Sequence, residues 1–154
     1  MAETLHLDDG ILELDINGRG LLRFNASDFN VYQRFIAIVK ELPEMEKKYM
    51  SEVEQPDNGD ELELAAANLN KAREIDRQIK ERLSEAFGQE NDFDNLLGGV
   101  NLMAFGRNGE RVITNLLNAL TPYIERGVKQ HMKDAAADAV AYAEKNRAQR
   151  RAEK

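Results

Sequence analysis

Apolar and polar residues alternate near the start of the chain. Between Leu12 and Ile16 every second residue is apolar and the residues between them are acidic, the period of two that places apolar side chains on one face of a strand. The alternation returns after Asn17-Gly18, a pair that tolerates the positive φ of a tight turn. Two further residues lengthen this connection, so residues 11–24 predict a hairpin with a four-residue loop or a bulge.

The spacing of apolar residues changes to three and four at about residue 28, which is typical of a helix. Asn25 or Ser27 can cap this helix, and Asp28 suits its first turn. Its apolar positions are Val31, Phe35, Ile38, Leu42, Met45 and Tyr49. Pro43 cannot donate a backbone hydrogen bond, so we expect either a kink or a break with Pro43 in the first turn of a second helix.

A second helix is expected over about residues 61–87. The stretch before it, residues 55–60, collects Pro, Asn, Gly and acids and predicts a solvent-exposed loop. Gly88 follows the last apolar position and is suited to ending the helix. Asp76 and Lys80 lie one turn apart and are expected to form a supporting surface pair.

The second half of the chain is less regular. Residues 89–109 show no clear period, whereas residues 110–120 carry an apolar helical stripe. Thr121-Pro122 predicts a kink or a restart of that helix. Beyond Gly127 an Ala-rich helix is expected to run to about residue 150.

These elements predict a mainly α protein with a short N-terminal β-hairpin, an α+β chain whose helices form a bundle-like domain. We expect residues 1–130 to form a single domain, since 154 residues fit one hydrophobic core. Residues 131–154 are expected to form the Ala-rich helix with a basic tail that is free to fray.

Charge is distributed unevenly. The net charge is −7, yet the residues after 144 carry +4 and residues 1–144 carry −11. Opposite charges at the two parts of the chain could steer an acidic partner to the tail or order subunits head to tail. The simpler interpretation is a solvated helix end.

The composition excludes several classes of site. The chain has no cysteine, which excludes disulfides, thiolate nucleophiles and cysteine-rich zinc sites. No basic start with an apolar run precedes the hairpin, and no apolar stretch approaches about 20 residues. A soluble, cytoplasmic protein without membrane contact is therefore expected.

The segment Gly106-Arg107-Asn108-Gly109 looks like the GxxG loop with which KH domains hold a nucleic-acid backbone. That interpretation needs a helix before the loop and strands packed around the helix pair. Together with Arg111 and the basic tail, the loop supports an alternative function as a nucleic-acid-binding accessory protein. We consider an ordinary turn at the entry to a helix the better interpretation, and nucleic acid an unlikely partner.

No set of residues predicts catalysis. Acids and amides cluster between Glu90 and Asn95, but their spacing fails the EF-hand pattern, so a solvated acidic loop is expected rather than a metal site. His6 and His131 have no evident partner, and no nucleophile triad, P-loop or dinucleotide motif is present. We therefore expect a protein that is not an enzyme and binds no cofactor.

Two segments together resemble tail assembly chaperone-like proteins of long-tailed phages and prophages from Gram-positive gut bacteria. They are LDINGRGLLRFNASDFNVYQRF and FGQENDFDNLLGGVNLMAF, the latter followed by GERVITNLLNALTPYIE. The resemblance covers most of residues 10–127. It implies a small, mostly helical, non-enzymatic protein of the bacterial host cytoplasm that binds the tape measure protein while tail tube subunits assemble around it.

Broad apolar helix faces would suit such a partner, because an amphipathic helix can lie in a groove between them. We therefore expect the chain to bind a helical tape-measure segment, and possibly the tail tube protein, or to self-associate. The residues predicted to make these contacts are Phe35, Ile38, Leu42, Leu116, Leu117 and Leu120. An exposed hairpin edge would also allow subunits to join by strand addition.

Overall fold

The computed structural model describes residues 1–52 and 61–152. Two strands and four helices follow one another in this part of the chain: β1 (Leu12–Asp15), β2 (Leu21–Phe24), α1 (Phe29–Glu52), α2 (Glu61–Phe87), α3 (Phe93–Leu96) and α4 (Val112–Ala152). The expected mainly α fold with a short N-terminal hairpin is confirmed. The loop predicted at residues 55–60 lies outside the described residues.

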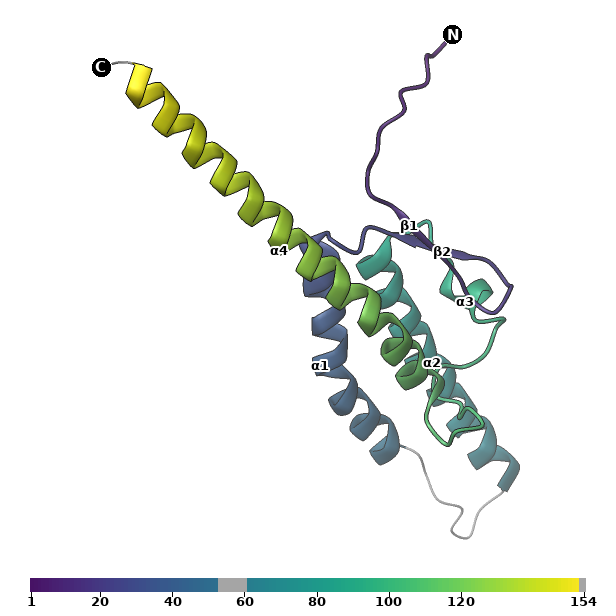
Figure 1. The fold of residues 1–154 in the computed structure, drawn as a ribbon. Coiled ribbons are helices and arrows are strands. Elements are labelled where there is room, and N and C mark those ends of the chain that lie inside the picture. The colour runs from purple at the N-terminus through teal and green to yellow at the C-terminus, as the bar shows by residue number, and fades with distance from the viewer. Residues whose placement is uncertain (53–60, 153–154) are drawn as a thin grey trace.

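The long helices form two layers beside the hairpin. Helices α1 and α2 run antiparallel and side by side, and α4 crosses them, as Figure 1 shows. The hairpin and α3 lie near the C-terminal end of α2. The N-terminal arm, which we define as residues 1–10, leaves the hairpin as an extended and exposed segment.

The hairpin forms as the alternation predicts. Strands β1 and β2 pair antiparallel, and Leu22 and Phe24 point into the core while their neighbours are exposed. Asn17 and Gly18 have φ of 53° and 74°, and the Arg19 N–H donates to the Ile16 carbonyl at 3.0 Å. This is a tight turn with an extra residue before the strands resume, which corresponds to the bulge rather than the four-residue loop.

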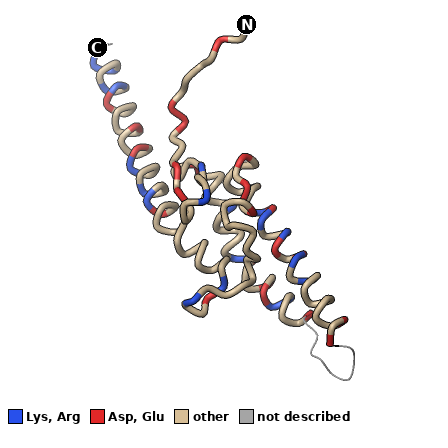
Figure 2. The backbone as a smooth tube through the Cα atoms, turned by 90° about the vertical axis from the view of Figure 1, so that its right-hand side faces the viewer, with Lys and Arg blue, Asp and Glu red and all other residues tan. Residues whose placement is uncertain are grey.

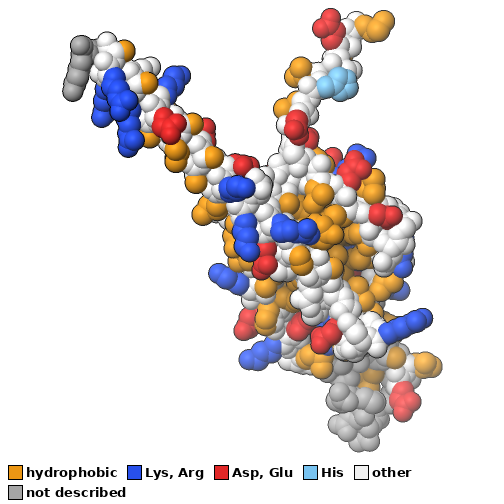
Figure 3. Space-filling view, viewed as in Figure 1, with side chains coloured by type: hydrophobic (Ala, Val, Ile, Leu, Met, Phe, Trp, Pro, Cys, Tyr) orange, Lys and Arg blue, Asp and Glu red, His pale blue; other side chains and the backbone are white. Residues whose placement is uncertain are grey.

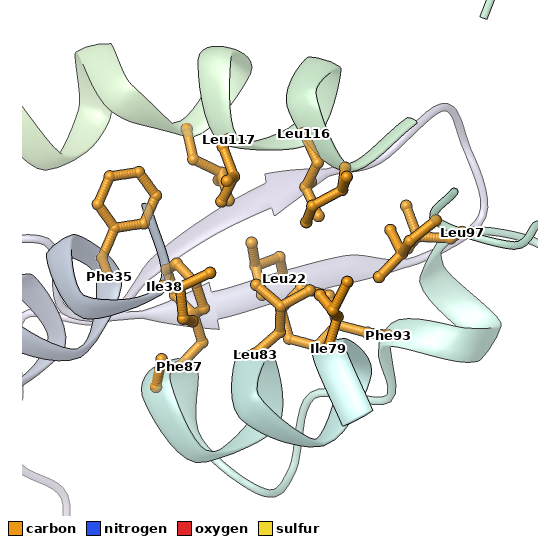
Figure 4. Close-up of a cluster of buried hydrophobic side chains, with 14 of the residues drawn as sticks. Leu22, Phe35, Ile38, Ile79, Leu83, Phe87, Phe93, Leu97, Leu116 and Leu117 are labelled. Carbon is orange, nitrogen blue, oxygen red and sulfur yellow. The ribbon is translucent and has the colours of Figure 1, made fainter. Parts of the chain in front are cut away.

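The core gathers side chains from the hairpin and all four helices. Figure 4 shows Leu22 of β2 between side chains of α2 and α4. Phe87, the last residue of α2, contacts three other rings: Phe24 at 4.9 Å, Phe93 at 5.9 Å and Phe35 at 6.2 Å between centroids. Edge-on and tilted pairs of this kind add to the stabilisation from burial. They join β2, α1, α2 and α3 in one cluster.

Neither proline interrupts its helix. Pro43 lies inside α1 and Pro122 inside α4, and both side chains are exposed. Each proline removes one hydrogen bond to the carbonyl four residues earlier. Those carbonyls belong to Val39 and Asn118, which are themselves exposed, so water can replace the missing donor. Of the two alternatives expected at each proline, a kink or a break, the break is wrong, because both helices continue through the proline.

Helix α4 also continues through Gly127, where it passes the connection between β2 and α1. A Cβ atom placed on Gly127 would lie 2.7 Å from the Cβ of Ala26 and nearer still to the Ala26 carbonyl. Only glycine lets the two backbones approach this closely. One turn later the His131 ring packs on Phe29 with 3.9 Å between centroids. His131, for which the sequence indicated no partner, thus makes the last aromatic contact of α4 with α1.

The start of α1 differs in detail from the prediction. The Asp28 carboxylate accepts the Asn30 N–H at 2.9 Å, as a helix cap does. The Asn25 side chain instead accepts the Ser27 N–H at 2.8 Å and donates to the Asp9 carbonyl at 2.8 Å. Asn25 therefore orders the turn before the helix and ties down the end of the N-terminal arm.

Beyond His131, α4 leaves the rest of the molecule. Every residue from 132 to 145 is exposed, and the helix continues to Ala152. We call residues 132–152 the α4 extension. At 1.5 Å per residue it projects about 30 Å, and Figure 1 shows it diverging from the N-terminal arm at the same end of the molecule.

Candidate interaction surfaces

The six residues predicted to bind a partner all lie in the core. They are Phe35, Ile38, Leu42, Leu116, Leu117 and Leu120, and each is at most 8% exposed. Their side chains pack against those of α2 and β2. A partner could reach them only after the helices separate, so in this conformation a binding surface has to be formed by other residues.

The hairpin has one covered edge and one open edge. The Asn91 side chain accepts the Arg23 N–H at 2.9 Å and donates to the Arg23 carbonyl at 2.8 Å. It thereby occupies the outward backbone groups of β2 as a neighbouring strand would. Glu13 faces Arg23 across the hairpin, so the backbone N–H and carbonyl of Glu13 also point outward, on the β1 side. No described residue forms a hydrogen bond with these two groups. The open edge of the hairpin is that of β1.

Asn91 was missed in the sequence because it sits among acids and amides that resemble a solvent loop. Its side chain is buried, and a second bond from it reaches the Phe87 carbonyl at 3.0 Å. Its partner in β2 is 68 residues away. No local pattern indicates such a contact.

The expected pair of Asp76 and Lys80 is confirmed, but it lies in a largely buried polar cluster and not on the surface. The Lys80 ammonium donates to Asp76 and Asp94 at 2.8 Å each and to the Val100 carbonyl at 3.1 Å. Burial lowers the pKa of Lys80, but the hydrogen bonds to Asp76 and Asp94 outweigh it, so the pKa is raised above the ordinary 10.5. Asp76 also accepts the Leu102 N–H at 2.7 Å. The three bonds of the Lys80 ammonium and the bond from Leu102 to Asp76 make the cluster a structural link between α2 and the segment before α4.

The acidic loop has structural roles as well. Asp92 caps α3 by accepting the Asn95 N–H at 3.2 Å, and Asp94 belongs to the Lys80 cluster. In the described ranges, no group of three or more His, Cys, Asp or Glu residues is arranged to hold a metal ion.

The Gly106–Gly109 segment forms a closed turn. The Gly106 N–H donates to the Glu110 carbonyl at 2.8 Å, and Phe105 and Arg111 form an isolated β-bridge. Irregular chain, not a helix, precedes the turn, which differs from the context of a KH loop. The Arg111 guanidinium lies over the Phe105 ring at 4.6 Å and donates to the Met103 carbonyl at 2.7 Å. Arg111 is thus engaged within the fold, while Arg107 is exposed.

A groove of about 560 Å³ runs between α1 and α2. Its apolar lining comes from Met45 and Tyr49 of α1 and Ile75 of α2. Met45 and Tyr49 are half-buried although their sequence spacing places them on the core stripe. Among the described residues, the groove therefore exposes part of that stripe, and Arg111 of the segment before α4 lies over the Tyr49 ring at 5.9 Å.

Charged residues border this groove. Arg82 of α2, which lines the groove, forms an ion pair with Glu41 of α1. The hydrogen bond to Glu41 raises the pKa of Arg82. Along α2, Arg77 bonds Glu74 at 2.6 Å and Glu81 at 2.5 Å. The hydrogen bonds that Glu74 accepts from Arg77 and Gln78 lower the pKa of its carboxyl group. An apolar floor with charged borders is the environment in which an amphipathic helix can bind.

The α4 extension and the N-terminal arm expose apolar side chains outside the core. On the extension, Met132 and Tyr142 are 60% and 69% exposed, and on the arm Leu5 and Leu7 are similarly open. Figure 3 shows hydrophobic side chains, in orange, on both projecting segments. In the part of the chain that the structure describes, no helix has the length and apolar character needed to cross a membrane.

Comparisons with known proteins give no relative of this chain: no protein-family model, no curated protein and no solved structure matches it.

Proposed function

We propose that this chain is a non-enzymatic tail assembly chaperone-like protein that binds the tape measure protein during phage tail morphogenesis. The groove between α1 and α2 is the observation that carries the proposal, because it combines an apolar floor of Met45, Tyr49 and Ile75 with charged borders, as an amphipathic helix requires. The sequence resemblance to phage tail assembly chaperone-like proteins supports the same function.

The expected ligand is an amphipathic helical segment of the tape measure protein. Its apolar stripe would cover Met45, Tyr49 and Ile75, and its polar flanks would face the charged borders of the groove. This places the partner on a half-buried surface that needs no opening of the core. The residues that the sequence predicted to bind a partner, among them Phe35 and the leucines of α4, are buried in the core and are not part of this proposed binding surface.

Co-expression with fragments of the neighbouring tape measure protein tests the proposal. The unmodified chain is expected to co-purify with at least one helical fragment. Met45→Glu should abolish this capture, because it places a carboxylate on the apolar floor, and far-UV circular dichroism should show an unchanged helix content. Met132→Glu is the matched control, since Met132 is exposed on the α4 extension and far from the groove. Failure of every fragment to co-purify, or equal loss in both variants, contradicts the proposal.

A further inference from the structure

The α4 extension carries an apolar face that nothing in the described chain covers. Steps of three and four residues lead from Met132 through Ala135, Ala139 and Tyr142 to Asn146, so these positions share one side of the helix. Asp134, Asp138 and Lys145 lie along one flank of this stripe, and Ala137, Ala141 and Glu144 lie on the opposite side. The large exposed side chains of the extension, Met132 and Tyr142, therefore share one side of the helix, beside a charged flank.

Charge identifies what can cover this face. The tip of the extension carries Lys145, Arg147, Arg150 and Arg151. The N-terminal arm carries Glu3, Asp8 and Asp9 and no lysine or arginine. Both segments project from the same end of the molecule and diverge, and Figure 2 shows red segments along the otherwise tan arm and blue segments toward the C-terminal end of the helix. The molecule thus presents an acidic and a basic projection in one direction.

We propose that two copies of this chain associate through their α4 extensions, packed antiparallel with Ala139 near the two-fold axis. In this arrangement residue 150 of one copy lies opposite residue 128 of the other. Each basic tip then reaches the root of the other extension, where Asn25 holds the acidic arm by its bond to Asp9. The contact is isologous, so each copy supplies the same tip and the same arm.

Side-chain size and charge both favour the antiparallel orientation over the parallel one. In a parallel pair the four basic residues of each tip would lie against their own copies, and like charges in contact are destabilising. Tyr142 would also face Tyr142 while alanines faced alanines, leaving the small residues poorly packed. In the antiparallel pair Tyr142 lies at the level of Ala135 and Ala136, and Met132 lies opposite Asn146, so each larger side chain meets a smaller one.

Sedimentation equilibrium of the full chain tests the association. The unmodified chain should sediment at twice its mass of 17.5 kDa. Ala139→Glu should give a monomer, whereas Ala141→Glu should remain dimeric because Ala141 lies on the other side of the helix. Arg150→Glu with Arg151→Glu should weaken the dimer by about fivefold, as expected for exposed ion pairs. A monomeric unmodified chain, or equal dissociation by both alanine variants, overturns the proposal.

Cysteine cross-linking tests the orientation, and the absence of native cysteine makes every disulfide attributable. Chains carrying Met132→Cys mixed with chains carrying Asn146→Cys should form a mixed disulfide on mild oxidation. Either variant alone should remain uncross-linked, since its own copies lie about 20 Å apart along the antiparallel pair. Cross-linking of Met132→Cys to itself, without the mixed product, would establish the parallel pair and overturn the proposal.

These results are separable from those of the proposed function. Met132→Glu should dissociate the dimer and preserve capture of the tape measure fragment. Met45→Glu should do the reverse, because the groove and the extension are formed by different elements.

Discussion

Replacement of Gly127 by alanine tests how tightly α4 is held against the rest of the fold. The added Cβ would lie 2.7 Å from the Ala26 Cβ and nearer still to the Ala26 carbonyl, distances at which atoms must move apart. Ala26 belongs to the short connection between β2 and α1, which Asn25 fixes by hydrogen bonds on both sides. The added methyl group therefore has to displace backbone rather than a flexible side chain.

Two effects of opposite sign set the magnitude. Alanine in a helix interior is more favourable than glycine by about 1 kcal/mol. Forcing an extra methyl group into a packed contact costs about 1–3 kcal/mol, and a clash with backbone belongs at the upper end. We expect Gly127→Ala to lower the free energy of unfolding by about 1–2 kcal/mol, or about 2–4 °C in Tm for each kcal/mol at this chain length.

Urea unfolding followed by circular dichroism measures this change. Ala119→Gly is the control, because Ala119 is exposed in the same helix and reports helix propensity alone; it should cost about 1 kcal/mol. The close approach of α4 to Ala26 would be refuted if Gly127→Ala raised the free energy of unfolding. The decisive result is a gain equal in size to the loss measured for Ala119→Gly.

Three further predictions concern single contacts in the fold. Asn91→Ala should lower the free energy of unfolding by about 2 kcal/mol, since it leaves the Arg23 backbone groups and the Phe87 carbonyl without their partner. Urea unfolding measures this change, and an unchanged free energy of unfolding would contradict the role of Asn91 at the edge of β2. Pro43→Ala should raise the free energy of unfolding by about 1–3 kcal/mol, because it restores a helix hydrogen bond at an exposed position. A lower urea midpoint of unfolding would contradict this prediction and show that the proline ring stabilises the fold. Because the pKa of Lys80 is raised in the folded state, its stabilisation is complete below pH 10.5 and is lost as the pH rises through the folded value. The stability difference between the unmodified chain and Lys80→Met should therefore shrink in alkaline solution, and a constant difference from pH 8 to pH 11.5 would contradict the ionic role.

Local signals in the sequence predict the elements whose limits are set locally. The hairpin follows from the alternation around Asn17-Gly18, and α2 begins and ends at the predicted residues 61 and 87 because a turn-forming stretch precedes it and Gly88 follows it. These determinants lie within a few residues of the elements that they define, so a single sequence contains them.

Contacts between distant segments explain what the sequence does not predict. Pro122 and Gly127 each favour a helix end locally, yet α4 continues because the proline is exposed and the glycine is required beside Ala26. The apolar stripe of Phe35 and Ile38 has the same spacing whether it faces a core or a partner, and only the placement of α2 and β2 decides that it faces the core. The groove is missed for the same reason, because it is formed where two predicted stripes separate.

The single amide that closes the outer edge of β2 has a consequence for how this protein can assemble. An exposed sheet edge is a template on which further strands can add, and a sheet with two open edges can grow without limit into fibres. With Asn91 bonded to Arg23, the edge of β2 is blocked at that residue, and of the two described strands β1 has the more accessible edge. Two copies that meet edge to edge would therefore use their available edges on each other and terminate, so the hairpin permits a closed pair and opposes a polymer.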